Sequence, residues 1–103
     1  MQSIIGKRIE LLIFEKGFPS IRSFANYMEE ILPYECVSKD TITNAIKGNE
    51  VRKGTLFSIA KSLDLPVECL TDEKLILIDD YLKEEVEPLK EEFDKKKRKR
   101  SIT

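Results

Sequence analysis

The segment from Val37 to Gly48 most limits what this chain can fold into, because residues at both ends mark one short helix. Ser38 is a residue type that caps the first turn of a helix, and Asp40 suits the positive end of the helix dipole. Gly48 supplies the left-handed residue at which many helices stop. The segment therefore predicts a short helix whose two ends are set locally.

This predicted helix has two different faces. Ile42 and Ile46 lie one turn apart with Ala45 beside them, so these three side chains face a core. The outward face is polar and consists of Asp40, Thr43, Asn44 and Lys47. Most amphipathic surface helices carry such a face and have no further role. The interpretation therefore depends on the neighbouring segments.

Apolar residues at helical spacing predict four more helices. The first runs from about Ser3 to Lys16 and is ended by Gly17, and the second begins after Ser20 and ends before Pro33. The other two cover residues 55–63 and the residues that follow Pro66. Their apolar stripes are Ile5, Ile9 and Leu12; Ile21, Phe24, Ala25, Met28 and Ile31 or Leu32; Leu56, Ile59, Ala60 and Leu63; and Val67 and Leu70.

In this order and spacing, the five segments resemble the phage Cro/repressor (XRE) family of helix-turn-helix DNA-binding domains over residues 4–72. The stretches that carry the resemblance are Ile5–Leu12, Lys16-Gly17, Val37–Gly48, Thr55–Leu63 and Val67–Leu70. The resemblance implies an all-α, five-helix Cro/repressor-like bundle. It also implies a sequence-specific transcriptional regulator that binds double-stranded DNA as a homodimer, with residues 37–48 in the major groove.

The resemblance assigns roles by position. Base reading falls to Lys39 through guanine acceptors, Asp40 through a cytosine amino group, Thr43 through its hydroxyl or methyl, and Asn44 through adenine. Phosphate contacts position the domain without reading sequence. The residues expected to make them are Ser20, Arg22, Lys47, Asn49, Lys53 and Thr55.

Two features depart from the family pattern. The connection between the second and third helices, around residues 32–37, is longer by roughly seven residues than the usual short turn. At the start of the second helix the family often has a polar residue, commonly Gln, whereas this chain has Ile21. Arg22 stands next to it and takes over the phosphate role in our interpretation.

A second apolar stripe on the first helix, made by Ile4, Leu11 and Phe14, needs a cover. Either a C-terminal helix of the same chain or a dimer partner supplies it, and we favour the chain's own helix. Residues 73–94 predict that helix, which is acidic and amphipathic and has Pro88 as a kink or new start. Its apolar residues are Leu75, Ile78, Leu82, Val86, Leu89 and Phe93.

Charge divides the chain into three parts: residues 1–72, the acidic extension 73–94 and the tail 95–103. Lys and Arg number nine against ten Asp and Glu in the first part, and three against nine in the second. Residues 95–100 are all Lys or Arg. Such a block is either a disordered, solvated tail or a sequence-independent DNA anchor.

Because the body is not basic, a protein-interaction module of the same fold, of the anti-repressor or antitoxin type, stays open as an alternative. In that interpretation the C-terminal helix contacts a protein partner. Salt dependence separates the two, because DNA binding weakens steeply with salt.

An enzyme is not expected, since the chain has no histidine, no Gly-rich phosphate loop and no nucleophile elbow. Two cysteines without histidine cannot form a four-ligand zinc site without help from carboxylates or a second chain, and neither metal nor cofactor is expected. No apolar run reaches the roughly 18 residues of a membrane span, and no signal peptide is evident. We therefore expect a soluble, cytoplasmic protein without membrane contact.

Overall fold

The computed structural model describes the backbone of residues 4–102 and the side chains of residues 4–92, 94 and 95. Within these residues it contains helices and no strand, so the expected all-α class is confirmed. The elements are α1 (Ile4–Glu15), α2 (Ile21–Ile31), α3 (Lys39–Ile46), α4 (Lys53–Ser62), α5 (Glu68–Thr71), α6 (Ile76–Tyr81), the π-helical turn η1 (Leu82–Val86) and α7 (Glu87–Ile102). The expected start of α1 near Ser3 lies outside the described residues.

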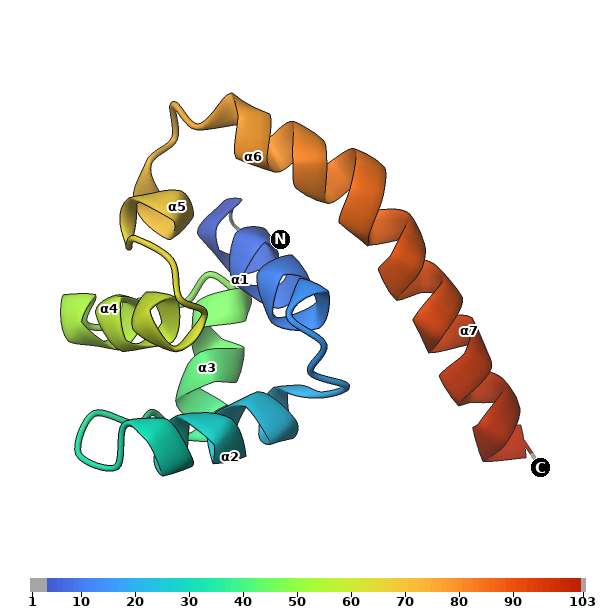
Figure 1. Cartoon of the computed structure of the whole chain (residues 1–103), viewed down its shortest axis with the longest axis horizontal. Coiled ribbons are helices and arrows are strands. Elements are labelled where there is room, and N and C mark those ends of the chain that lie inside the picture. The colour runs from blue at the N-terminus through green and yellow to red at the C-terminus, as the bar shows by residue number, and fades with distance from the viewer. Residues whose placement is uncertain (1–3, 103) are drawn as a thin grey trace.

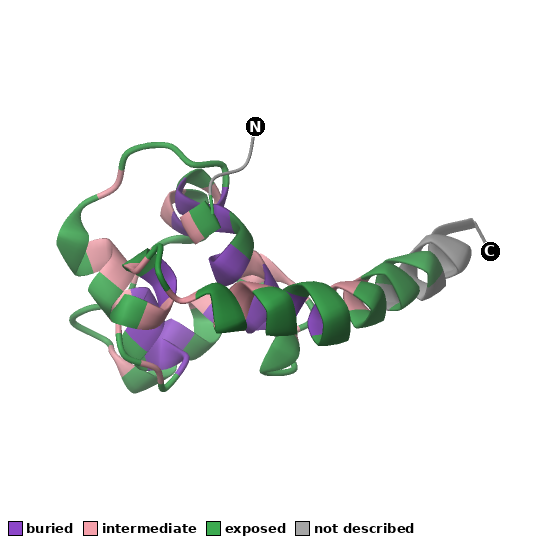
Figure 2. Cartoon of the chain, turned by 90° about the horizontal axis from the view of Figure 1, so that it is seen from above, coloured by how far each residue is buried: buried purple, intermediate pink, exposed green. Residues whose placement is uncertain are grey.

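Helices α1 to α5 pack together as one bundle, and α6, η1 and α7 form a long arm that arches past α1 (Figure 1). The buried residues of the bundle and of the first half of the arm face each other, whereas α7 leaves the bundle towards its C-terminal end (Figure 2). None of the described helices is both long and apolar enough to cross a membrane.

The predicted ends of α3 are confirmed. Ser38 occupies the N-cap, and its Oγ accepts a hydrogen bond of 3.2 Å from the backbone N–H of Thr41. The helix ends at Ile46, and Gly48 follows with a left-handed φ of 85°. Because a residue with a Cβ is strained there, Gly48 lets the chain turn away towards α4.

Gly6 makes possible the close crossing of α1 over the end of α3. A Cβ at this position would overlap the backbone carbonyl of Ile46. Ile9 and Ile42, one from each helix, are completely buried in the core. The two helices therefore meet backbone to backbone at Gly6 and side chain to side chain at the next turn.

The predicted stripes form one continuous core. Its buried members from α2, α4 and α5 include Phe24, Met28, Ile59, Ala60 and Leu70, with Leu63 just beyond α4. Leu82 and Val86 from the arm belong to the same core cluster. The arm is therefore part of the bundle's core.

The second stripe of α1 is covered by the chain's own C-terminal helix, as we expected. Leu11 is buried, and it lines one seam together with Ile4 of α1 and Leu82 of the arm. Ile4 lies at the edge of this seam and stays half exposed. Leu82, which is 2 % exposed, packs within the chain and is not available to a dimer partner.

Pro88 is the second residue of α7, directly after the π-helical turn η1. The helical backbone continues from η1 into α7, and proline has no N–H to donate, so it removes one backbone hydrogen bond there and favours a kink. A π-helical turn and a proline are both recognised causes of bends in long helices. Together they account for the bend of the arm around α1 and agree with the predicted kink.

The basic residues 95–100 continue α7 as a helix, whereas one of our two expectations for them was a disordered tail. The backbone of α7 continues through residues 95–100 to Ile102. Lys and Arg are good helix formers, and positive charge suits the C-terminal end of a helix dipole. The side chains of Phe93 and of residues 96–102, and the whole of Thr103, lie outside the described residues.

Candidate nucleic-acid interface

The outward face of α3 carries the four predicted base-reading residues. Lys39, Asp40 and Asn44 are exposed, and Thr43 is half-buried. The hydroxyl of Thr43 donates a hydrogen bond of 2.9 Å to the backbone carbonyl of Lys39. Thr43 therefore offers its methyl group and its remaining oxygen lone pairs, while the other three side chains are open for contacts of their own.

Asn44 and Asn49 are brought together where α3 ends. The side-chain nitrogen of Asn49 donates to the side-chain oxygen of Asn44 at 3.4 Å, and the backbone N–H of Asn49 donates to the carbonyl of Asn44 at 2.9 Å. The long side-chain bond leaves the amide group of Asn44 free to donate. A predicted base-reading residue thus lies beside a predicted phosphate contact.

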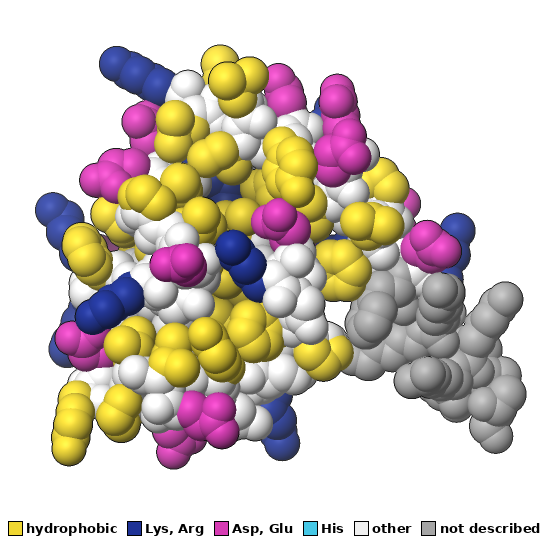
Figure 3. Space-filling model, in the orientation of Figure 1, with side chains coloured by type: hydrophobic (Ala, Val, Ile, Leu, Met, Phe, Trp, Pro, Cys, Tyr) yellow, Lys and Arg dark blue, Asp and Glu magenta, His cyan; other side chains and the backbone are white. Residues whose placement is uncertain are grey.

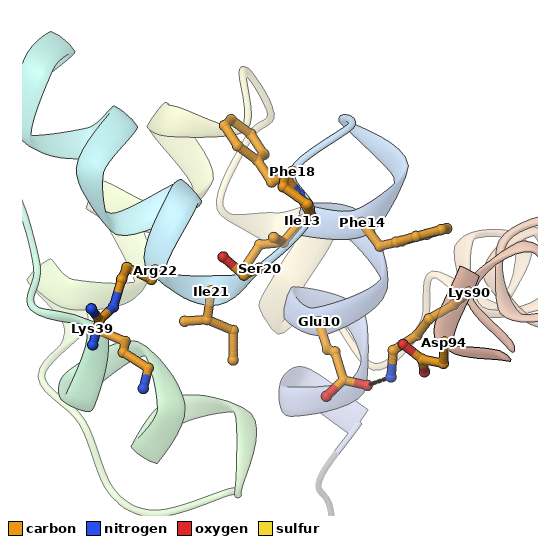
Figure 4. Close-up of a pocket in the computed structure, with 11 residues that line it drawn as sticks. Glu10, Ile13, Phe14, Phe18, Ser20, Ile21, Arg22, Lys39, Lys90 and Asp94 are labelled. Carbon is orange, nitrogen blue, oxygen red and sulfur yellow. Dashed lines mark hydrogen bonds and ion pairs between the residues drawn. The ribbon is translucent and has the colours of Figure 1, made fainter. Parts of the chain in front are cut away.

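Arg22 and Lys39 lie together although seventeen positions of sequence separate them. Both line a hollow bordered by α1, α2, α3 and α7, which we call the α2–α7 hollow, and both line a second hollow beside the connection of residues 32–38. In Figure 4 they lie on one side of the α2–α7 hollow, and Lys90 and Asp94 lie on the other. The starts of α2 and α3 are therefore adjacent.

Ser20, a predicted phosphate contact, is the N-cap of α2. Its Oγ accepts a hydrogen bond of 3.1 Å from the backbone N–H of Ser23 and lies 2.9 Å from the Ser23 hydroxyl. The Ser20 oxygen is thus already used by the first turn of α2. Its structural role is to cap α2 and so to fix the first turn, which carries Arg22.

The longer connection between α2 and α3 is tied to the bundle. Glu35 within it forms an ion pair of 3.3 Å with Lys61 of α4. Its last residue is Ser38, the cap of α3. The additional residues therefore loop out between two helices whose starts remain adjacent.

The start of α4 adds a third group of predicted contacts. Arg52 precedes the helix, Lys53 is its first residue, and Thr55 lines a hollow together with Asn44. Lys47, the C-cap of α3, is exposed, as are Arg52 and Lys53. Asn44 thus lines one hollow with Thr55, a predicted phosphate contact of α4.

Four of the described cations form ion pairs, whereas the exposed cations around α3 do not. Lys7, Arg8, Lys61 and Lys90 are paired with Glu87, Asp79, Glu35 and Glu10. Within the part of the chain that the structure describes, five cations around α3 form no ion pair: Arg22, Lys39, Lys47, Arg52 and Lys53. Their charge is available to an anion.

Carboxylates interrupt this positive surface. Asp40 lies on α3, Glu29 lines a hollow with Arg22 and Lys39, and Glu50 lines the hollow beside Asn44. On the face seen in Figure 3, charged side chains of both signs are interspersed. The five unpaired cations around α3 nevertheless outnumber these three carboxylates.

Sequence reasoning missed the role of Arg8. This residue is 1 % exposed and takes no part in the surface, because its guanidinium forms hydrogen bonds with Asp79 and with two backbone carbonyls. The signal lay in its spacing, since Ile4, Arg8 and Leu11 share one face of α1. A cation within an apolar stripe needs a buried acceptor.

Comparisons with known proteins found no matching protein family, no matching curated protein and no matching solved structure.

Proposed function

We propose that this chain is a sequence-specific, DNA-binding transcriptional regulator with a Cro/repressor-like helix-turn-helix domain. In this proposal α2 and α3 are the helix pair, α3 enters the major groove, and two copies bind a two-fold operator. The observation that carries the proposal is that five exposed cations, none of which forms an ion pair among the described residues, gather around α3.

The dimensions of α3 suit this role. An α-helix with its side chains is about 10 to 12 Å in diameter, and the major groove is about 12 Å wide and admits such a helix. Lys39 and Asn44 have the donors and acceptors that recognise guanine and adenine, and both side chains are exposed. Asp40 repels phosphates and favours a cytosine amino group, which adds discrimination rather than affinity.

Phosphate contacts would come from three places around α3. Arg22 lies at the start of α2, Lys47 and Asn49 lie at the end of α3, and Lys53 lies at the start of α4. Such contacts orient a domain on DNA and release counterions, so they make affinity strongly dependent on salt. A surface for an uncharged protein partner has no need of five unpaired cations.

The test is to select bound fragments from a random duplex pool at two salt concentrations. The intact chain is compared with the double variant Lys39→Ala, Asn44→Ala, and with Lys74→Ala as a control. Lys74 is exposed, forms no ion pair within the described residues and lies in the turn before α6, at the opposite end of the bundle from the start of α2 (Figure 1). We expect a nearly palindromic motif with the intact chain and the control, and its loss in the double variant.

Retention of DNA without any motif would contradict sequence reading. Absence of retention at either salt concentration would contradict DNA binding altogether and would favour the protein-interaction module. Selection of the same motif by the double variant would show that other residues read the bases.

A further inference from the structure

The α7 part of the arm borders the same hollow as two cations of the candidate interface. Lys90 and Asp94 of α7 line the α2–α7 hollow, opposite Arg22 and Lys39 (Figure 4). At Asp94 the helix therefore faces the starts of α2 and α3 across this hollow. The basic segment begins with the next residue.

The course of α7 up to this point is set by contacts with α1. Glu87 pairs with Lys7 at 3.3 Å, and Lys90 pairs with Glu10. Val86 is buried in the core immediately before α7 begins. Beyond Asp94 the backbone continues as a helix to Ile102, which adds about 12 Å at the rise of an α-helix.

Charge along α7 changes sign at the hollow. Residues 87–94 contain four acidic residues and one lysine, whereas residues 95–100 are all basic. Phosphates repel the first part and attract the second, so only the end of α7 can approach DNA. Duplex DNA carries one charge per about 1.7 Å of its axis, so a helical segment of this length can face several phosphates.

We infer that residues 95–100 form a second DNA contact that extends the phosphate contacts of the α2 start along the backbone of the duplex. The inference rests on the proposed function. The contact involves phosphates only, because a run of cations carries no base-specific donor and acceptor pattern. It supplies affinity that the nearly neutral body lacks, while α3 supplies the choice of sequence.

The experiment replaces Lys96, Lys97, Arg98 and Lys99 with Gln, which has similar helix propensity and therefore preserves α7. The control replaces Lys74 and Lys83 with Gln, since both are exposed and form no ion pair within the described residues. Binding of a fluorescent duplex of mixed sequence and of the selected operator is measured over a series of salt concentrations. Circular dichroism checks that both variants retain the helix content of the intact chain.

We expect the slope of log K against log salt to become shallower by about 0.9 for each phosphate that the tail no longer neutralises, and therefore by about 2 to 4 in the tail variant. The control should keep the original slope, and the tail variant should still select the original motif. An unchanged slope and affinity in the tail variant would overturn the inference.

The outcomes for this inference and for the proposed function are distinguishable. If the intact chain selects no motif, sequence reading fails, while the slope on mixed-sequence DNA still decides the role of the tail. If the intact chain binds no DNA, both proposals fail. A change of molar mass in the tail variant by analytical ultracentrifugation, without a change of slope, would assign the tail to contacts between copies and overturn the inference.

Discussion

Arg8 and Asp79 form a two-pronged ion pair that joins α1 to the arm. Nε of Arg8 donates to Oδ1 of Asp79 at 2.7 Å, and Nη2 donates to Oδ2 at 2.9 Å. Nη1 of Arg8 also donates to the backbone carbonyls of Leu70 at 3.2 Å and Asp72 at 2.8 Å. A single buried guanidinium thus satisfies carbonyls at the end of α5 and holds the start of the arm.

Replacement of Asp79 by Ala should destabilise the chain, because it leaves the buried Arg8 charge without its anionic partner. Removal of one partner of a fully buried pair costs about 3 to 5 kcal/mol, and we expect about 2 kcal/mol here since the Asp79 side chain is 38 % exposed. Urea denaturation measures the change. Asp80→Ala is the control, because Asp80 is exposed and forms no ion pair within the described residues; equal destabilisation in both variants would contradict the role of the pair.

The same pair predicts a decrease of stability in acid. Hydrogen bonding to Arg8 lowers the pKa of Asp79 in the folded chain. As the pH falls, Asp79 is therefore protonated in the unfolded chain before it is protonated in the folded chain. The stabilisation by the ion pair is fully present above the ordinary aspartate pKa of about 3.9, and it is lost as the pH falls through the lower pKa that Asp79 has in the folded chain. The difference in free energy of unfolding between the parent and Asp79→Asn should shrink accordingly. A difference that stays constant over this range would contradict the lowered pKa of Asp79.

Gly6→Ala should loosen the crossing of α1 and α3, because the new methyl group would overlap the carbonyl of Ile46, which is backbone and cannot rotate away. Overpacking of this kind costs about 1 to 3 kcal/mol. Gly54→Ala is a matched control, since a Cβ there meets nothing within 4 Å and Ala is the better helix former by up to about 1 kcal/mol. The two midpoints of thermal unfolding should therefore move in opposite directions, and a joint increase would refute the close crossing.

Leu82→Ala should destabilise the chain by about 2 to 4 kcal/mol, because Leu82 is 2 % exposed and its truncation leaves a cavity between the arm and α1. Leu77, at 84 % exposure on the neighbouring turn, serves as the control. Its replacement by Ala should change the free energy of unfolding by less than about 0.5 kcal/mol. If both variants were equally stable, the arm would not be packed on the bundle.

Asn44→Ala should lower discrimination at one base pair of the operator by about 1 to 3 kcal/mol. Lys53→Ala provides the contrast, because removal of a phosphate contact weakens binding to every sequence and reduces the salt slope by about 1. Competition binding with single-base operator variants separates the two effects. An unchanged preference in Asn44→Ala would remove this residue from the base-reading group.

Local signals were sufficient to predict the ends of α2 and α3, whereas α4 begins two residues before the predicted start at Thr55 and α7 continues past the predicted end at Asp94. Ser38 and Gly48 bound α3, Ser20 and Pro33 bracket α2, and residues at helical spacing form the buried stripes. These predictions succeeded because a cap or a stripe depends on residues within one or two turns of each other. The same spacing on α1 predicted a second covered face, and the arm covers it.

The sequence by itself determined an all-α chain, the positions of its helices and the polar face of α3, because capping and helical periodicity act over a few residues. Only the tertiary structure decided which charges are neutralised. Arg8 finds Asp79 71 positions away, whereas Arg22 and Lys39 meet at the helix starts and stay unpaired among the described residues. Pairing depends on which distant segments pack together, and composition and periodicity do not specify those contacts.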